Sequence, residues 1–190
     1  INYGGEDVNM NEIVERKFAG DVINLKIWRD RKPMAAKVTL KRFLPYLISA
    51  KKYDQKPRYV MFAGLVFQPL DRNLMTAHGI KDLQVRYHYD SYVSDSIYKE
   101  RPEIIVLTSI LPDSINSYFS SYAQSIVDMV NGVKIRTLKD IHTALPKNDG
   151  DFVTARLLGN GRPIVIERSS VPAAQKRIHE KYNMIHDHYL

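Results

Sequence analysis

One sequence pattern occurs twice in this chain, and it constrains the fold more than any other feature. Each copy begins with Gly-Asp, continues through a run in which apolar and polar residues alternate, and closes with a basic residue followed by proline. The copies span residues 20–33 and 150–163, with the same distance from glycine to proline. Alternation with a period of two, interrupted by a turn, is typical of two short antiparallel strands. The sequence therefore predicts a hairpin in each copy, with turns at residues 29–31 and 159–161.

The similarity between the copies continues upstream of each hairpin. A short helix with an N-terminal capping signature is predicted in front of each one. The signature is Asn9 followed by Glu12 in the first copy, and Thr137 followed by Asp140 in the second. A turn precedes each helix. We therefore expect one structural unit to be present twice, complete in the second copy and partial in the first, in a chain that is part of a longer protein.

Composition excludes several classes of protein. The chain has 190 residues, of which 44% are hydrophobic, and this is enough for ordinary cores. It has no cysteine, which excludes disulfides and thiolate metal ligands, and it has no apolar run of about 18 residues that could span a membrane. The formal net charge is +7, but the basic residues are dispersed. Dispersed charge is typical of a solvated surface, so we expect no specific nucleic-acid site, and steep salt dependence of binding would revise this expectation.

Three segments are expected along the chain. Residues 1–42 form the partial first unit, residues 43–57 form a linker, and residues 58–190 form the second unit with a C-terminal helix. The linker contains Leu47, Ile48 and Tyr53, so it is expected to pack on a neighbour rather than to behave as a loose tether.

The second unit is expected to contain most of the regular structure. Two strands around Gly64, further strands and one well-capped helix are predicted at residues 59–70, 104–111, 125–130, 133–135 and 138–145, before the hairpin. Residues 71–103 show no clear pattern beyond a helical turn at 73–78 and a tyrosine-rich stretch, for which packing, an oligomer contact or a stacking surface are alternatives. The expected fold class is mainly β with helices (α+β), as a small, partly open barrel or sandwich.

The order of these elements resembles a PDZ domain. It consists of a glycine-interrupted strand pair, an apolar strand, the turn Val130-Asn131-Gly132, a helix and a hairpin. More narrowly, residues 59–70, 104–111, 130–135 and 164–167 resemble the terminal PDZ domain of Deg/HtrA (protease Do-like) serine proteases. Residues 1–42 resemble the end of the PDZ domain that precedes it in such proteins.

The resemblance implies a parent protein with functions that the residues alone do not indicate. That parent is a trypsin-like, ATP-independent serine endopeptidase, assembled into a homo-oligomer. Its PDZ domains regulate access and recognise unfolded or C-terminal peptide segments. An extracytoplasmic space or an organelle lumen is the compartment that the resemblance favours. We therefore expect a non-catalytic PDZ region for recognition, regulation or assembly, and the alternative is a free-standing PDZ scaffold without a protease.

The resemblance also implies a peptide-binding site. The loop that would bind a ligand carboxylate through backbone amides is formed by Gly64, Leu65, Val66 and Phe67. The ligand would add as a strand to the edge after this loop, against a helix face formed by Leu138, Ile141, His142 and Leu145. Pro69 removes one amide donor from that edge. The alternative, which stays open, is a closed loop or one filled by a segment of the same or a neighbouring chain.

No catalytic or metal site is expected in this chain. Thr76-Ala77-His78 is similar to the sequence around the histidine of trypsin-like proteases, but no serine lies between glycines as the nucleophile loop requires. We interpret His78 as a loop histidine. The spacing of His179, His186 and His188 does not place all three on one helical face, so we interpret them as solvated, and we expect neither a metal nor a cofactor.

Overall fold

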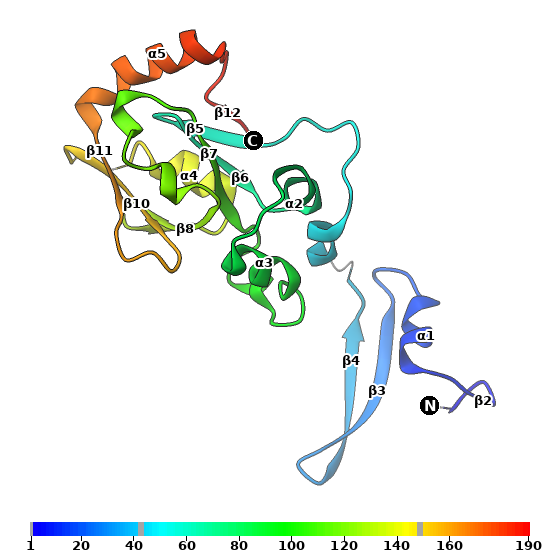
Figure 1. The fold of residues 1–190 in the computed structure, drawn as a ribbon. Helices are drawn as coiled ribbons and strands as arrows, with labels where there is room; N and C mark the ends of the chain where they lie inside the picture. The colour runs from blue at the N-terminus through cyan, green and yellow to red at the C-terminus, as the bar shows by residue number, and fades with distance from the viewer. Residues whose placement is uncertain (1, 42–43, 148–149) are drawn as a thin grey trace. The chain divides into compact units, whose positions relative to one another are not determined.

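The computed structural model describes residues 2–41, 44–147 and 150–190 (Figure 1). The chain divides into two compact units, Ile1–Leu44 and Pro45–Leu190. The expected boundary at residues 42–43 lies outside the described residues. In the part of the chain that is described, no helix is long and apolar enough to cross a membrane.

The first unit consists of two hairpins and a short helix. The elements are β1 (Asn2–Tyr3), β2 (Glu6–Asp7), α1 (Met10–Glu15), β3 (Val22–Arg29) and β4 (Lys32–Thr39). Strands β3 and β4 pair in register over their whole length. Their turn is formed by Asp30 and Arg31, which have positive φ angles of 53° and 59°. Such a two-residue turn matches the right-handed twist of the strands, and it confirms the hairpin predicted there.

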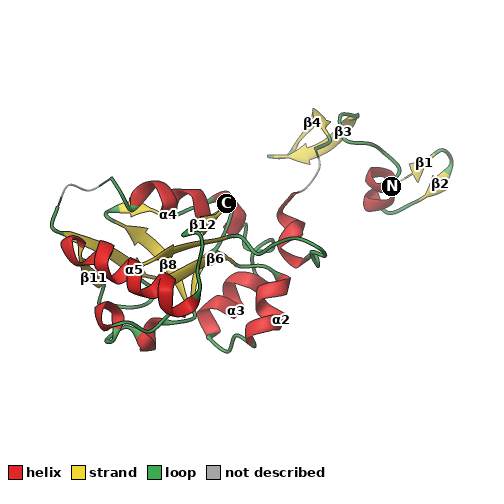
Figure 2. Ribbon diagram, turned by 90° about the horizontal axis from the view of Figure 1, so that it is seen from above, coloured by secondary structure: helices red, strands yellow, loops and turns green. Residues whose placement is uncertain are grey.

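The second unit is built around one antiparallel sheet (Figures 1 and 2). Its strand order is β12-β5-β6-β7-β8-β10-β11, and β9 pairs with β8 beside this path. The strands are β5 (Tyr59–Phe62), β6 (Leu65–Pro69), β7 (Ile105–Ile110), β8 (Ser125–Val130), β9 (Val133–Lys134), β10 (Phe152–Leu157), β11 (Ile164–Glu167) and β12 (His188–Tyr189).

Helices connect and cover these strands (Figure 2). The α-helices are α2 (Arg72–His78), α3 (Leu83–Asp90), α4 (Leu138–Ala144) and α5 (Val171–Tyr182). Short 3₁₀ helices are η1 (Leu44–Ser49), η2 (Ile97–Lys99), η3 (Ser114–Asn116), η4 (Ser120–Tyr122) and η5 (Arg168–Ser170). Antiparallel β structure with helices confirms the predicted fold class.

Two hydrophobic clusters form the interior of the second unit. The larger one joins the sheet to α4, and it includes Val60, Leu65 and Phe67. The smaller one lies under α2 and α3, with Leu74, Val85 and Tyr92 among its members. Residues 71–103 are therefore a helical segment with a core of its own, although the sequence pattern there was not informative.

Tyr92 and one residue of the expected linker contact the smaller cluster. The Tyr92 hydroxyl donates to the Pro102 carbonyl at 2.5 Å, and burial, with the charge of Glu103 adding to it, raises the pKa of Tyr92 to about 12. From the expected linker, Ile48 packs on this cluster. Leu47 and Tyr53 do not, since they are 51% and 73% exposed. Of these three linker residues, Ile48 is therefore the one that contacts the cluster.

Helix α4 and the strands beside it follow their local sequence signals. The Asp140 amide donates to Thr137 Oγ1 at 3.3 Å, and the Thr137 amide donates to Asp140 Oδ2 at 2.8 Å, which completes the predicted capping box. Asn131 and Gly132 form the turn before it, with φ angles of 48° and 77°. The order helix then hairpin occurs in both units. The second hairpin turn is longer than the first, however, because β10 ends at Leu157 and β11 begins only at Ile164.

Candidate functional site

The predicted carboxylate loop is a tight turn between β5 and β6. Ala63 and Gly64 occupy the turn with φ angles of 50° and 81°, and Phe62 pairs with Leu65 across it. Leu65 and Phe67 are 2% and 1% exposed, so their side chains belong to the core. Val66 points to the other face and is half-buried. The residues after the turn therefore place two of their side chains in the core.

Polar groups of this turn are already paired with distant parts of the second unit. The Ala63 amide donates to Gln175 Oε1 on α5 at 2.9 Å. The Ala63 carbonyl accepts from the buried Asn116 side chain at 2.9 Å, and the Gly64 carbonyl accepts from the Leu111 amide at 2.7 Å. Asn116 and α5 thus close the loop from two sides. These pairings favour the closed loop that the sequence left open as an alternative, and the peptide-binding role of the loop stays a prediction.

The strand after the loop has no free edge. Strand β6 pairs with β5 on one side and with β7 on the other. The exposed edge expected at β6 is therefore absent, because the chain folds back at Gly64 and places β5 where an incoming strand would lie. Pro69 is opposite Ile105 within the β6–β7 pairing. The backbone N–H that proline lacks is therefore missing from that pairing, and not from hydrogen bonds to an added peptide.

The predicted helix face is mostly part of the core. Leu138 and Ile141 are fully buried and share one cluster with Val60 of β5, while Leu145 packs at its margin. His142 differs from these three. It is half-buried, and its ring lies 4.4 Å from the ring of His188, centroid to centroid. The structure therefore brings the loop and helix residues together around β5, and only His142 faces a separate segment.

That separate segment is β12, a strand near the C-terminus that lies along the outer edge of β5 (Figure 1). His188 is opposite Val60 and Tyr189 is opposite Tyr59, in antiparallel orientation. Just before the strand, the Asp187 carbonyl accepts from the Met61 amide at 2.6 Å. The Tyr59 hydroxyl adds a bond to the His186 carbonyl at 2.9 Å. A strand has thus been added to the sheet beside α4, from within the same chain.

The side chain of Asp187 fixes this strand to α5. Its Oδ1 lies 2.5 Å from His179 Nε2, and it also accepts a hydrogen bond from Gln175 Nε2. Gln175 therefore links β12 to the Ala63–Gly64 turn, because its Nε2 donates to Asp187 and its Oε1 accepts from the Ala63 amide. The interpretation of the tail histidines as solvated was wrong for His179, which is half-buried, whereas His188 is exposed although it is part of β12. An Asp between two His residues after an amphipathic helix is the only signal that the sequence carries for this arrangement.

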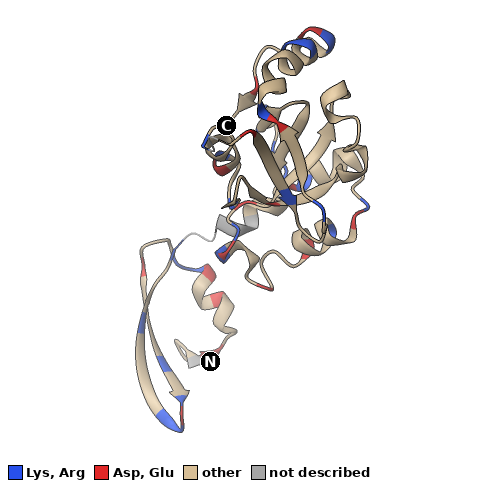
Figure 3. Ribbon diagram, turned by 90° about the vertical axis from the view of Figure 1, so that its left-hand side faces the viewer, with Lys and Arg blue, Asp and Glu red and all other residues tan. Residues whose placement is uncertain are grey.

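Other candidate chemistry lies elsewhere in the second unit. His78 is the last residue of α2 and not a loop residue. Among the residues that the structure describes, no group of three or more His, Asp or Glu side chains is arranged to hold a metal ion. Figure 3 shows that Lys and Arg are distributed over many elements, which agrees with the dispersed pattern in the sequence.

Comparison with known proteins identifies relatives of this arrangement. Residues 48–188 match a family model described as "PDZ domain". The chain is 28% identical to "Putative protease Do-like 12, mitochondrial" of Arabidopsis thaliana, over 93% of this chain and 32% of that protein. It is 27% identical to "Putative protease Do-like 13" of the same plant, over 94% and 32%.

A protein from another organism gives a similar match. The chain is 29% identical to "Serine protease DegP homolog" of Plasmodium falciparum (isolate 3D7), over 72% of this chain and 15% of that protein. The chain thus spans about a third, or less, of the length of these curated relatives.

Proposed function

The chain belongs to the PDZ domain family, as part of the PDZ region of Deg/HtrA proteases, and from this we propose that its second unit recognises extended peptide segments by strand addition at the edge of β5. The observation that carries the proposal is β12. It shows that the β5 edge, next to His142 of α4, accepts an antiparallel strand. Strand addition of this kind draws affinity from main-chain hydrogen bonds and specificity from alternate side chains.

The resident strand makes recognition conditional. A peptide reaches the β5 edge only when β12 leaves it, so the apparent affinity falls by the fraction of molecules with a free edge. The contact of β12 is short, His188–Tyr189, but tethering gives it an effective concentration in about the millimolar range. Peptide recognition and regulation are therefore two aspects of one site in this proposal.

The wider role that we propose is that of a recognition and regulatory region for a serine endopeptidase. The support is the likeness to proteins named as Do-like proteases along most of this chain. Homo-oligomer assembly is part of the same proposal. The alternative is a free-standing PDZ scaffold. The sequence in front of Ile1 discriminates the two, because a Gly-x-Ser-Gly-Gly loop there supports the protease.

A peptide-binding experiment tests the proposal. The probe is a synthetic peptide with the sequence of residues 184–190, titrated into the chain and into Asp187→Ala. The substitution removes the bonds from Gln175 and His179 to the resident strand, whereas the peptide keeps its own aspartate. We expect about tenfold tighter binding to Asp187→Ala, measured by calorimetry. The amide resonances of residues 59–62 should shift.

Glu180→Ala is the matched control, because it removes an exposed acidic side chain of α5 without touching β12. It should bind the peptide like the unmodified chain. The proposal is wrong if the peptide binds neither the unmodified chain nor Asp187→Ala, or if the shifted resonances belong to β11 at the opposite edge of the sheet.

A further inference from the structure

Two Asn-Gly pairs occur in this chain, and their asparagine side chains are held differently. Asn131-Gly132 is the turn between β8 and β9, and Asn160-Gly161 lies in the loop between β10 and β11. Because glycine has no Cβ, its backbone can turn so that its nitrogen reaches the side-chain carbonyl of the preceding asparagine. Whether this happens in the folded chain depends on how the asparagine is held.

The side chain of Asn131 is fixed by hydrogen bonds to both ends of its amide. Its Oδ1 accepts from the Thr154 amide at 2.9 Å. Its Nδ2 donates to the carbonyls of Ala144 and Leu145 at 3.0 Å and 3.3 Å. The side chain therefore connects β10 to the end of α4. Turning its Cγ toward the Gly132 nitrogen would break these bonds and leave their partners unpaired.

The side chain of Asn160 makes a local contact instead. Its Oδ1 accepts from the Arg162 amide, two residues further along the chain, at 3.3 Å. This N–H polarises the side-chain carbonyl, and it lies at the oxygen on which negative charge develops when Cγ is attacked. Gly161 is exposed, and nothing lies within 4 Å of its Cβ position. The backbone at Gly161 therefore has room to turn toward Asn160.

A polar cavity of about 200 Å³ brings water to this position. Asn160 lines it together with Asp82 and Gln84 at the start of α3 and Ser125 of β8. Water is the second reactant in the chemistry of an Asn-Gly pair. The loop thus combines an accessible glycine nitrogen, a polarised amide carbonyl and a path for water.

From these contacts we propose that Asn160 is a site of spontaneous deamidation in the folded chain, whereas the hydrogen bonds of Asn131 protect it. The Gly161 nitrogen attacks Asn160 Cγ and forms a C–N bond. The side-chain nitrogen leaves as ammonia and takes the proton of the Gly161 amide, so that the product is a cyclic succinimide. Water then adds to one of the two carbonyl carbons and opens the ring, which leaves aspartate or isoaspartate at position 160.

The modification adds a negative charge to a cavity that Asp82 already lines. Asp82 caps α3, because its Oδ1 accepts from the Val85 amide at 2.9 Å. The side chain of Gln84 lies close to Gly159 of the same loop. Since two like charges in one cavity repel each other, the contact between this loop and α3 weakens as the chain ages.

Incubation of the folded chain at a mildly alkaline pH, followed by peptide mapping with mass spectrometry, tests the proposal. Deamidation is recognised by the change in mass, and isoaspartate by enzymatic methylation. We expect position 160 to react at least about tenfold faster than position 131, because the hydrogen bonds of Asn131 must break first. In urea the two positions should react at similar rates. Gly161→Ala, which meets no neighbour, should slow the reaction at position 160.

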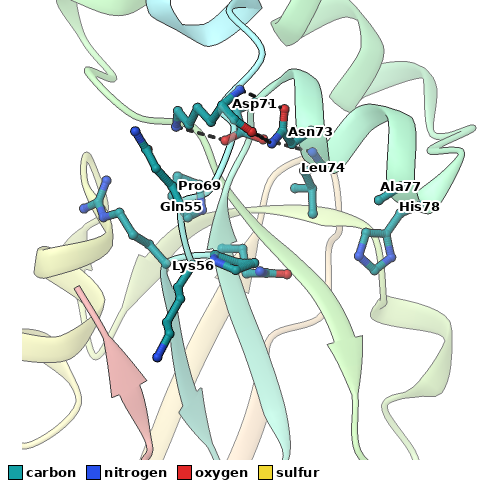
Figure 4. Close-up of a pocket in the computed structure, with 12 residues that line it drawn as sticks. Gln55, Lys56, Pro69, Asp71, Asn73, Leu74, Ala77 and His78 are labelled. Atoms are coloured by element: carbon teal, nitrogen blue, oxygen red, sulfur yellow. Dashed lines mark hydrogen bonds and ion pairs between the residues drawn. The ribbon is translucent and has the colours of Figure 1, made fainter.

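Asn73 is the internal reference for these measurements (Figure 4). Figure 4 shows it beside Asp71, and its side chain is bonded to the main chain of Lys52 in both directions, at 3.2 Å and 2.7 Å. Leucine follows it in the sequence. We therefore expect Asn73 to stay unmodified in the folded chain and to react more slowly than both Asn-Gly pairs in urea.

A pair of variants tests the effect on α3. Asn160→Asp carries the charge of the modified chain, and Asn160→Gln keeps a neutral amide. We expect Asn160→Asp to unfold at a lower urea concentration than Asn160→Gln, and equal midpoints would show that the added charge does not weaken the contact with α3. The assignment of the site is wrong if positions 160 and 131 react equally fast in the folded chain, or if position 160 stays unmodified there.

Discussion

At the scale of single residues, close packing of the chain explains the glycine at position 64. Its φ of +81° is a backbone conformation that glycine adopts without strain. A Cβ at this position would meet the Leu111 carbonyl oxygen at 2.5 Å and would overlap the Asn116 side chain. A glycine in a short apolar run was the feature that suggested a carboxylate loop. The close approach of the Leu111 main chain and of the buried Asn116 side-chain amide to Gly64 explains the same residue.

Replacing this glycine should therefore destabilise the second unit. Gly64→Ala combines an unfavourable φ with a clash against main chain, and we expect a loss of about 2–4 kcal/mol in the free energy of unfolding. Urea titration followed by circular dichroism measures it. Gly132→Ala is the control, because Gly132 also has a positive φ, +77°, but nothing lies within 4 Å of its Cβ position.

The control should lose only about 1 kcal/mol, the cost of the backbone conformation. Equal losses in Gly64→Ala and Gly132→Ala would show that the contacts with Leu111 and Asn116 have no role in stability.

At the scale of elements, α5 is attached to the rest of the second unit by an ion pair as well as by its apolar face. Ala174 and Ile178 of α5 are buried. Arg177 binds Asp113, the N-cap of η3, through two hydrogen bonds of 2.7 Å and 3.0 Å. The hydrogen bond from Arg177 is the main cause that lowers the pKa of Asp113 from 3.8 to about 2. Since α5 also carries Gln175 and His179, this pair supports the helix that holds β12.

The lowered pKa of Asp113 predicts a loss of stability in acid. Below about pH 4 the unfolded chain protonates this carboxylate, whereas the folded chain keeps it ionised until about pH 2. The free energy of unfolding therefore falls across this interval as the pH decreases. Asp113→Asn should lose about 1 kcal/mol near neutral pH, a modest value because water screens the half-exposed Arg177.

Urea unfolding at a series of pH values measures this effect. The difference between Asp113→Asn and the unmodified chain should shrink as the pH approaches 2. Asp54→Asn, at an exposed position, should behave like the unmodified chain throughout. A constant difference between pH 5 and pH 2 would contradict the assignment of the lowered pKa to Asp113.

At the scale of the whole molecule, the two units differ in how much they bury. Among the residues whose burial the structure describes, all of the buried hydrophobic ones lie in the second unit, between Val60 and Ile178. In the first unit, Phe18 is 80% exposed and Trp28 is 73% exposed. Two hairpins with a single short helix have little apolar surface to enclose, and isolated two-stranded hairpins are marginally stable in water.

Separate reporters should therefore give different unfolding curves for the two units. Trp28 is the only tryptophan of the chain, so its fluorescence reports on the first unit. We expect emission typical of a solvent-exposed indole, with little change during urea titration. The double variant Trp28→Phe, Phe119→Trp places the reporter against the larger cluster of the second unit, where a cooperative transition is expected. Coincident curves would contradict this difference.

The elements that the sequence predicted are those determined by neighbouring residues. The hairpin at residues 20–33, the capping box of α4 and the Asn131–Gly132 turn each depend on side chains within a few positions of one another. The second hairpin turn was predicted too short. The distance from Gly to Pro is the same in both copies of the pattern, but this distance does not determine where the two strands stop pairing. Helix α2 was predicted as a helical turn at 73–78, whereas α3 was missed, although Asp82 caps it.

The candidate site was decided by tertiary contacts. The sequence identified the residues around Gly64 and on α4, yet it left open whether the loop was accessible. That depended on Asn116 and Gln175, which lie far from Gly64 along the chain. The partner of the β5 edge could not be predicted either, since a strand as short as His188–Tyr189 has no recognisable period. Local propensities determined the elements, whereas the long-range pairing of main-chain donors and acceptors decided which edge of the sheet was left for a ligand.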